Sequence, residues 1–276
     1  MDSLVKPGND NVFMNEILQL IDAQLDELLP AETDNPTLLH AAMRYSVFSG
    51  GKRIRPVLCV AVCEALGGSV QDALVASCAI EILHTYTLIH DDLPAMDDDD
   101  MRRGKPSCHK KFNEATAILA GDALLTLAFE WLGGTGNVQP VVDLARASGS
   151  LGIIAGQQDD MTMKNSTPSK AQLLEMQRKK TAILFSVSCG IGARCAKAGN
   201  DQIAHAQLFG ETLGRAFQLF DDLCDNDPVT MSVIGREETM KLAEKYKADS
   251  YNELSAFASE ATQLRDIIDF TYSSFK

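Results

Sequence analysis

The stretch His84–Arg103 reads HTYTLIHDDLPAMDDDDMRR and holds six aspartates within ten residues, followed after one methionine by two arginines. The aspartates are Asp91, Asp92, Asp97, Asp98, Asp99 and Asp100, and the arginines are Arg102 and Arg103. Carboxylates this dense raise one another's pKa unless a cation lies among them. Oxygen ligands suit Mg²⁺, which completes its shell with water and phosphate, and arginines supply forked donors for phosphate. The stretch therefore indicates a magnesium–phosphate site, with a solvated acidic loop as the alternative.

The composition indicates a folded protein that does not bind nucleic acid. The chain of 276 residues is 45% hydrophobic and 23% charged, and its formal net charge is −13. Because no basic excess is available to displace counterions, nucleic acid is excluded as a partner. Its seven cysteines lie mostly in apolar segments, which favours buried thiols in a reducing cytoplasm over a zinc site. The start of the chain lacks the apolar core of a secretion signal, and we expect no membrane span.

The pattern of apolar residues predicts helices throughout and no sheet. Apolar positions recur at helical spacing, and sustained period-two alternation is absent from the sequence. The predicted helices cover residues 11–29, 37–49, 56–67, 70–90, 115–132, 141–161, 169–183, 202–225, 236–247 and 251–275. The almost uniformly apolar stretch 115–132 is expected to be a central buried helix. We predict an all-α bundle of about ten or more helices in one domain spanning residues 1–276.

Three further motifs could complete a site with the aspartate stretch. The turn Gly50–Pro56 reads GGKRIRP and places three cations before a helix start, where anions bind well, although a plain helix–helix turn is the alternative. Lys179-Lys180-Thr181 lies midway along another helix. In 217–225, FQLFDDLCD, the side chains of Gln218, Asp221 and Asp225 share one helix face. Like charges at this spacing indicate a neutralising cation, unless the helix end is solvated.

These motifs, in this order, resemble the trans-isoprenyl diphosphate synthases over nearly the whole chain. The anchors are GGKRIRP (50–56), HDDLPAMDDDDMRRGKPSCH (90–109), LAGDALL (119–125), GQQDD (156–160), KKT (179–181) and FQLFDDLCD (217–225). The chain carries the family's DDxxxxD and DDxxD motifs intact. The resemblance implies the isoprenoid synthase type of fold, with helices around a central apolar cavity.

The resemblance also implies roles for particular residues. The metal ligands would be Asp91, Asp92, Asp97, Asp221, Asp222 and Asp225, which would hold three Mg²⁺ ions once substrate is bound. Arg102 would contact the allylic diphosphate and Arg103 the isopentenyl diphosphate. Gly51, Lys52, Arg55 and His84 would complete the isopentenyl diphosphate pocket. Lys180, Thr181 and Gln218 would face the allylic diphosphate and the developing cation.

The implied chemistry agrees with these residue types. Metal ions draw charge onto the departing diphosphate, so that the allylic C–O bond ionises. The carbocation then needs a dry cavity until the isopentenyl double bond attacks it and a proton leaves to the released diphosphate. This reaction requires no side-chain nucleophile, and the sequence offers no convincing Ser-His-Asp or Cys-His set.

Product length is expected to depend on Tyr86 and its neighbour Thr87. Tyr86 precedes Asp91 by five residues and so lies roughly 7–8 Å deeper along the helix. A ring there could form the floor of the cavity, although ordinary core packing is the alternative. Together with the Pro94-Ala95 insertion, this aromatic residue resembles the bacterial-type farnesyl diphosphate synthases. We therefore expect condensation of isopentenyl diphosphate with dimethylallyl or geranyl diphosphate to give farnesyl diphosphate.

The chain departs from the family pattern after Asp225. Members carry a longer loop here, with a lysine that contacts the allylic diphosphate, and that lysine has no counterpart in Asn226–Met231. Either the loop is deleted or a mobile segment is missing from the sequence, and we favour the second explanation. The family's terminal arginine is not evident either.

Several other interpretations stay open. The product could be geranylgeranyl or geranyl diphosphate, or the chain could be a non-catalytic regulatory subunit. A terpene cyclase also uses paired acidic motifs, but it does not need the GGKRIRP turn or Arg103 for a second diphosphate. Family members are usually homodimers, so we expect a homodimer.

Overall fold

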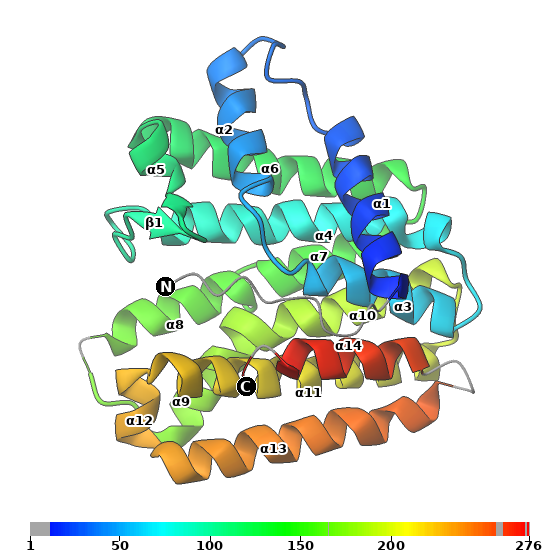
Figure 1. The fold of residues 1–276 in the computed structure, drawn as a ribbon, viewed down its shortest axis with the longest axis vertical. Helices are drawn as coiled ribbons and strands as arrows, with labels where there is room; N and C mark the ends of the chain where they lie inside the picture. The colour runs from blue at the N-terminus through cyan, green and yellow to red at the C-terminus, as the bar shows by residue number, and fades with distance from the viewer. Residues whose placement is uncertain (1–11, 165, 258–261, 274, 276) are drawn as a thin grey trace.

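The computed structural model describes residues 12–164, 166–257, 262–273 and 275, and it is built almost entirely of helices (Figure 1). The first half comprises α1 Val12–Leu28, α2 Thr37–Val47, α3 Ile54–Ala65, α4 Val70–Asp91, β1 Met101–Arg102, β2 Lys105–Pro106, α5 Cys108–Lys111 and α6 Glu114–Gly134. The second half comprises α7 Val138–Ser148, α8 Ile153–Met163, α9 Lys170–Gln177, η1 Arg178–Ala182, α10 Ile183–Cys195, α11 Asn200–Asp225, α12 Pro228–Val233, α13 Arg236–Glu253, η2 Leu254–Ala256 and α14 Thr262–Ser273.

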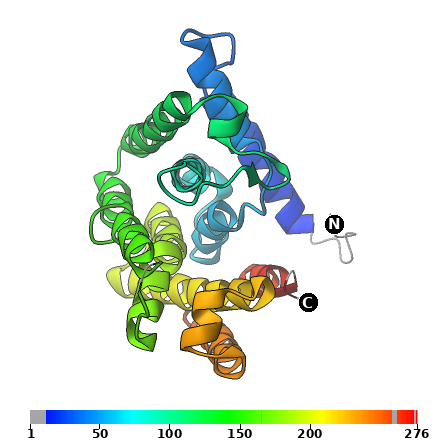
Figure 2. The same ribbon diagram turned by 90° about the vertical axis from the view of Figure 1, so that its left-hand side faces the viewer.

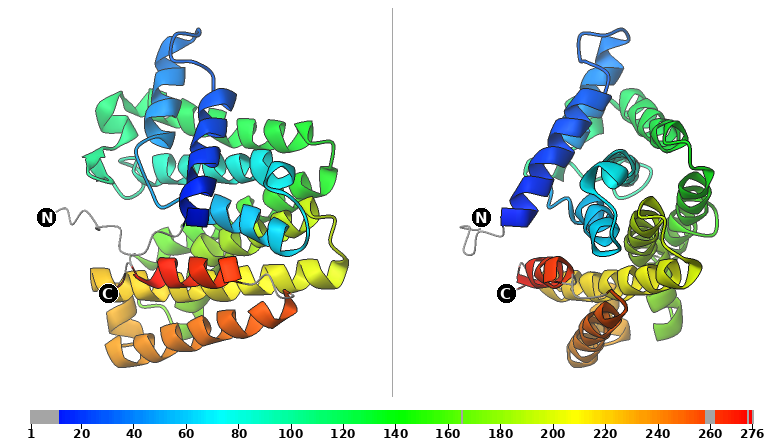
Figure 3. Two further views of the ribbon diagram at one scale, coloured as in Figure 1. Left: turned by 45° about the vertical axis from the view of Figure 1, so that its right-hand side comes forward. Right: turned by 90° about the vertical axis from the view of Figure 1, so that its right-hand side faces the viewer.

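Helices α3 and α4 lie inside a ring of other helices (Figure 2). Helix α4 packs against α3 and α6, and α3 packs against α10, which in turn lies along α11. Helix α13 lies outside this ring against α11, as both views in Figure 3 show. The middle of α4 is buried as its sequence predicts, and residues from Ala76 to Leu83 are almost completely enclosed. The two aspartate motifs therefore sit at the ends of two long helices, α4 and α11, that the core holds in place.

The prediction of a central buried helix over residues 115–132 is wrong. This segment is α6, which packs against α4, α2 and α7 along one side but leaves Ile118 44% and Leu119 57% exposed. Its apolar residues surround the helix, so the sequence pattern did not show that only one side meets the core.

Two other predicted elements differ in the structure. The predicted helix over residues 141–161 is interrupted, and α7 and α8 are separate helices with a turn at residues 149–152. A side chain at Gly152 would collide with the carbonyl group of Ala147, so the turn depends on a glycine at this position. The sequence also indicated no strands, but Met101 pairs with Pro106 and Arg102 with Lys105 in a short antiparallel hairpin.

The predicted helix that begins after Ser169 contains a π-helical turn. Ser169 caps α9 by accepting a hydrogen bond from the amide of Gln172, as predicted. The helical path then widens at η1, Arg178–Ala182, before it continues as α10. Single π turns inside α-helices are frequent at functional sites, and this one carries the KKT motif.

Within the described residues, two helices, α4 and α6, are long and apolar enough to cross a membrane by length and composition alone. The expectation of no membrane span is therefore not supported by length and composition alone. The apolar window of α4 is 67% buried inside the structure and that of α6 is 33% buried. Core helices pass the same test, so these two helices are weak evidence for a membrane span.

Candidate active site

A cavity of about 970 Å³ lies between the ends of α4 and α11 and reaches down to α6, α8 and η1. Among the residues with predicted roles, its lining includes Gly51, Lys52, Arg55, His84, Tyr86, Thr87, Asp91, Arg102, Arg103, Lys180, Thr181, Gln218 and Asp221. Apolar groups complete the wall, among them Leu88, Leu125, Ile153, Ile154, Leu184 and Phe217. The cavity therefore combines charged groups from five distant segments with an apolar interior.

The first acidic motif contributes Asp91 directly to the cavity. Its side chain is 16% exposed, and Oδ1 is buried without a hydrogen-bond partner among the described residues. Oδ2 lies 3.7 Å from Lys180 Nζ. Burial raises the pKa of Asp91 to about 6, although Lys180 opposes the rise. A buried oxygen with this much unsatisfied charge is a suitable ligand for a cation.

The other two aspartates of the first motif are held by cations of the protein. Asp92 is buried and accepts hydrogen bonds from Arg102, one of them from Nε at 2.9 Å. It is not part of the cavity lining. The amide of Asp97 donates to the carbonyl oxygen of Asp91 at 3.0 Å, which folds the loop back, and its carboxylate pairs with Lys164. The structure thus brings Asp97 near Asp91 and turns Asp92 toward Arg102.

The second acidic motif is divided between the cavity and its surroundings. Asp221 lines the cavity, and burial raises the pKa of its carboxyl group, with Asp225 adding to the rise. Asp222 instead accepts hydrogen bonds from Gln177 Nε2 at 2.6 Å, Thr230 Oγ1 at 2.6 Å and Gln218 Nε2 at 2.7 Å. The structure therefore does not bring Asp222 into the cavity lining, nor does it bring the exposed Asp225 there.

The glycine turn before α3 presents cations to the same cavity. Gly50 and Gly51 have φ values of 102° and 126°, and a side chain at Gly51 would collide with the guanidinium of Arg103. Arg103 donates to the carbonyl oxygen of Gly50, so this guanidinium packs directly on the turn. Lys52 lines the cavity near Asp221, whose charge opposes the lowering of the Lys52 pKa by burial. The close approach of backbone and guanidinium explains the glycine requirement.

Of the three cations predicted on this turn, Arg53 has a structural role instead. It donates from Nη1 to Glu81 at 2.6 Å, and both side chains are buried. The sequence already contained a signal for this pair, because Glu81 stands alone in an apolar helix and a buried carboxylate needs a partner. The buried pair lines the cavity and fixes the start of α3 against α4.

Arg55 and His84 lie side by side at the cavity wall. Arg55 Nη1 lies 3.2 Å from His84 Nε2, and Arg55 Nε is buried with no partner in the part of the chain that is described. Burial lowers the pKa of Arg55 to about 10. Burial and then the neighbouring Arg55 lower the pKa of His84 well below its ordinary value. An unpaired guanidinium donor beside a neutral imidazole is suited to an anion.

The π turn aims Lys180 and Thr181 into the cavity. Lys180 Nζ lies 2.7 Å from Asp160, and Thr181 Oγ1 donates to Gln218 Oε1 at 2.6 Å. A side chain at Gly156 would collide with the backbone at Lys180, which explains how α8 packs so closely on the turn. Sequence reasoning grouped the GQQDD segment with the site but missed that Asp160 is the partner of Lys180.

Tyr86 is 5% exposed and lines the cavity, with its ring edge-on to His90 at a centroid distance of 5.6 Å. Thr87 lines the same cavity. A side chain at Gly121 of α6 would overlap His90, so the glycine of the LAGDALL motif lets α6 and α4 approach closely here.

Comparisons with known proteins agree with this site. The sequence profile of the polyprenyl synthetase family matches residues 36–239. The large subunit 1 of the heterodimeric geranylgeranyl pyrophosphate synthase of Arabidopsis thaliana is 37% identical over 281 residues, which cover 90% of this chain and 75% of that protein.

Two solved structures share the fold. A farnesyl/geranylfarnesyl diphosphate (FPP/GFPP) synthase from Zymomonas mobilis superposes with a TM-score of 0.88 at 37% identity, over 94% of this chain and 97% of that one. A geranyltransferase from Legionella pneumophila gives a TM-score of 0.88 at 31% identity, over 95% and 96% of the two chains. The fold is the all-α isoprenoid synthase type. The chain belongs to the polyprenyl synthetase family and is a prenyltransferase.

The raised pKa of Asp91 predicts how the metal-free protein responds to pH. Because the folded-state pKa of about 6 exceeds the ordinary 3.8, the contribution of Asp91 to stability is complete below about pH 4 and is lost as pH rises through 6. In the absence of divalent ions, Asp91→Asn should therefore raise the free energy of unfolding by about 1–2 kcal/mol at pH 7. The gain should vanish near pH 4. Urea denaturation followed by circular dichroism in a chelator measures both values.

Asp249→Asn, which changes a carboxylate outside the cavity, is the matched control and should have little effect. A variant at position 91 that is no more stable than the parent at pH 7 would show that the Asp91 carboxylate is not strained by burial.

Proposed function

We propose that the protein condenses isopentenyl diphosphate with dimethylallyl or geranyl diphosphate, in a Mg²⁺-dependent reaction, to give farnesyl diphosphate. The observation that carries this proposal is the arrangement of one cavity of about 970 Å³, where Asp91 and Asp221 share the lining with the cations Lys52, Arg55 and Arg103. A cavity that binds two diphosphates needs both kinds of charge. A single-diphosphate enzyme, such as a cyclase, would not need the second set of cations.

We assign the isopentenyl diphosphate to the glycine turn. Lys52 and Arg55 offer ammonium and guanidinium donors, and Gly51 lets the backbone and Arg103 approach the same point. The unpartnered Nε of Arg55 can donate to a phosphate oxygen, which would neutralise a partly desolvated cation. His84 stays neutral beside Arg55, so it can supply a hydrogen bond without adding charge repulsion.

We assign Mg²⁺ to Asp91, Asp97 and Asp221. The donor set consists of hard carboxylate oxygens, and the buried, unpartnered Oδ1 of Asp91 fits a cation. When bound with substrate, the ions would neutralise the departing diphosphate. Asp92 and Asp222, which accept hydrogen bonds from Arg102 and Gln218, act by holding those side chains in position. Asp225 is exposed, but its charge acts on Asp221, so it would add a carboxylate beside that ligand at the end of α11.

The remaining predicted groups face the allylic diphosphate and the developing cation. Lys180 balances Asp91 and Asp160 and keeps a raised pKa, so it stays charged and can contact an anion that enters between them. Thr181 and Gln218 are joined by a hydrogen bond and present oxygen atoms to the cavity. Such oxygen dipoles stabilise positive charge in a low-dielectric site, and the apolar wall excludes water that would capture it.

The segment that follows Asp225 is short, and helix-capping interactions hold it in place. Asn226 has a φ of 52° and ends α11, and Asp227 caps α12 by accepting a hydrogen bond from the amide of Thr230 at 2.7 Å. The same residue, Thr230, donates to Asp222. In the chain as it stands, α12 therefore occupies the place after the second motif, and the lysine of the longer family loop has no counterpart. We infer that Lys52 and Lys180 provide the nearby positive charge.

The proposed activity is tested by incubating the protein with labelled isopentenyl diphosphate, geranyl diphosphate and Mg²⁺. We expect chain extension that a chelator abolishes, and Asp221→Asn should lower the turnover rate by at least about a hundredfold through the loss of electrostatic stabilisation. Asp249→Asn should behave like the parent. A cyclic hydrocarbon would indicate a cyclase, and the absence of turnover would indicate a regulatory subunit.

We propose that the side chain of Tyr86 limits the length of the product. Its buried ring lines the cavity, which supports a floor that stops elongation at fifteen carbons. A second candidate product, geranylgeranyl diphosphate, is favoured by the Arabidopsis relative, whose name states that product. Geranyl diphosphate is a third, shorter candidate. Thr87 follows Tyr86 on the same wall and would contact the growing chain.

Replacing Tyr86 with alanine should lengthen the product by at least one five-carbon unit, because the ring no longer closes the cavity. Tyr86→Phe keeps the bulk of the ring and should leave the product unchanged. Both products are measured by chromatography of the dephosphorylated prenyl alcohols. A parent enzyme that already makes twenty carbons, or an alanine variant with the parental product, would contradict the assignment of Tyr86 as the floor.

We also propose that the chain forms a homodimer through α6. The exposed Ile118 and Leu119 support this, since apolar side chains on one side of a helix are commonly covered by a partner. Leu119→Glu should convert the dimer to a monomer in sedimentation velocity, whereas Met240→Glu, an exposed apolar position on α13, should not. A parent that sediments as a monomer would exclude the homodimer, and a requirement for a second type of chain would match the heterodimeric relative instead.

Two broader expectations complete the proposal. We propose that residues 1–276 form one domain, because a single cluster of buried apolar side chains extends from Met14 to Tyr272. We propose a cytoplasmic location because each of the seven cysteines is a free thiol and five of them are buried.

A further inference from the structure

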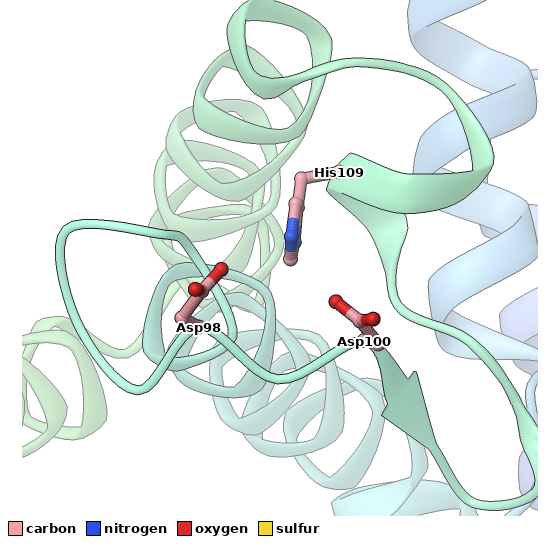
Figure 4. Close-up of side chains that lie close together, drawn as sticks. All are labelled: Asp98, Asp100 and His109. Carbon is pink, nitrogen blue, oxygen red and sulfur yellow. The ribbon is translucent and has the colours of Figure 1, made fainter.

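Three groups outside the proposed catalytic cavity lie close together at the tip of the loop after α4 (Figure 4). Asp98, Asp100 and His109 each offer one ligand atom, and these atoms all lie within 4.8 Å of one another. None of the three belongs to the cavity lining. Asp98 and Asp100 belong to the acidic stretch, yet the prenyl transfer chemistry assigns them no role.

The backbone of this segment is arranged so that the three groups meet. Asp98 has a φ of 54°, and its amide donates to the carbonyl oxygen of Leu93 at 3.2 Å. The amide of Ser107 donates to the carbonyl oxygen of Asp100 at 2.9 Å, which closes the β1–β2 hairpin. The hairpin returns the chain to α5, where His109 lies between the two carboxylates (Figure 4).

His109 supplies an independent reason to expect a ligand. It is only 7% exposed, and its Nδ1 lies 3.1 Å from Ser107 Oγ. Its Nε2 is buried and has no hydrogen-bond partner within the described ranges. A buried imidazole nitrogen without a partner costs free energy, whereas metal-bound histidines characteristically use the other ring nitrogen for a hydrogen bond that fixes the ring. With Nδ1 next to a hydrogen-bonding group and Nε2 buried without a partner, His109 has the arrangement of a metal-binding histidine.

We propose that Asp98, Asp100 and His109 bind a divalent transition-metal ion such as Zn²⁺, Mn²⁺ or Co²⁺. Imidazole nitrogen suits these ions, and Mg²⁺ prefers oxygen ligands, so this site differs in chemistry from the all-carboxylate site in the cavity. Donors at about 2.0–2.2 Å from one ion are at most roughly 4.4 Å apart, so a small closure of the loop completes the geometry. The remaining coordination positions are open to water.

One ion pair at this cluster must be accommodated when a metal binds. Lys110 Nζ lies 2.7 Å from Asp100 Oδ1, and Lys110 also interacts with the charge of Asp98. Asp100 retains its second oxygen for a metal, and the exposed Lys110 side chain can move into solvent. The position of the Lys110 ammonium group shows that the two carboxylates attract a positive charge.

The bound ion would join the acidic loop to α5 across the β1–β2 hairpin. This hairpin carries Arg102, which holds Asp92, and in its turn Arg103, which packs on Gly50. A metal at its base would restrict the motion of both arginines relative to the cavity. The site is therefore a positioning site and not part of the reacting machinery.

The proposal is tested by titrating the purified protein with Co²⁺ while millimolar Mg²⁺ occupies the all-oxygen sites. Visible absorption of bound Co²⁺ reports nitrogen ligation, and the same titration is followed as a shift in the melting temperature. The parent should show one saturable site. His109→Gln should remove the absorption change or weaken binding at least about tenfold, while His205→Gln, an exposed histidine on α11, should bind as the parent does.

Asp98→Asn provides the second variant, in case His109→Gln does not fold. Asparagine tolerates the left-handed backbone at position 98 and the side chain is exposed, so the variant keeps the loop and removes only the ligand charge. It should also bind Co²⁺ at least about tenfold more weakly. Co²⁺ binding by Asp98→Asn at the parental affinity, or a parent without a saturable site under Mg²⁺, would overturn the proposal. Because the readout is binding, this result is independent of prenyl transfer.

Discussion

Two partly buried carboxylates, Asp91 and Asp221, border one cavity together with guanidinium and ammonium groups, and the rest of the structure depends on keeping them there. Charges withdrawn from water are unfavourable unless the fold holds them in place. Both lie near the C-terminal ends of long helices, α4 and α11, which pack against α3, α6 and α10. The buried Arg53–Glu81 pair, which lines the cavity, fixes α3 against α4. The large apolar core is what makes this concentration of charge possible.

The sequence predicted the long helices well because their signals are local. Helices α1, α4 and α11 begin and end within two residues of the predicted limits, and Ser169 caps α9 as its sequence indicates. The position of α6 was not predictable in the same way. Its apolar residues around Ile118 show that the side chains avoid water, but not whether the core or another chain covers them. The break at Gly152 depends on a contact with Ala147 that spacing alone does not reveal.

The candidate site was predictable in its composition and less so in its orientation. The motifs come together at one cavity, and Asp91, Asp221, Lys180 and Arg55 all line it. The sequence treated the three aspartates of each motif alike, whereas Asp222 turns away from the cavity. It does so because two residues donate hydrogen bonds to it: Gln177, which is distant in the sequence, and Thr230, which lies on another helix. Partners of this kind are set by tertiary packing, so a motif identifies a set of candidate ligands but not the side chain that faces the substrate.

The π turn at Arg178–Ala182 has a consequence for how this surface can change. One residue of an α-helix rotates the chain by about 100°, so the wider turn offsets the faces of α9 and α10. Gln177 on the α9 side of the turn reaches Asp222, and Thr181 within it reaches Gln218. Residues 177 and 181 share a face in any helix, but the extra residue of the wider turn changes which side of α10 follows on from that face. The orientation of α10 behind the site is thus encoded by the number of residues in one helical turn, and a change of length there would rotate α10 relative to Gln177.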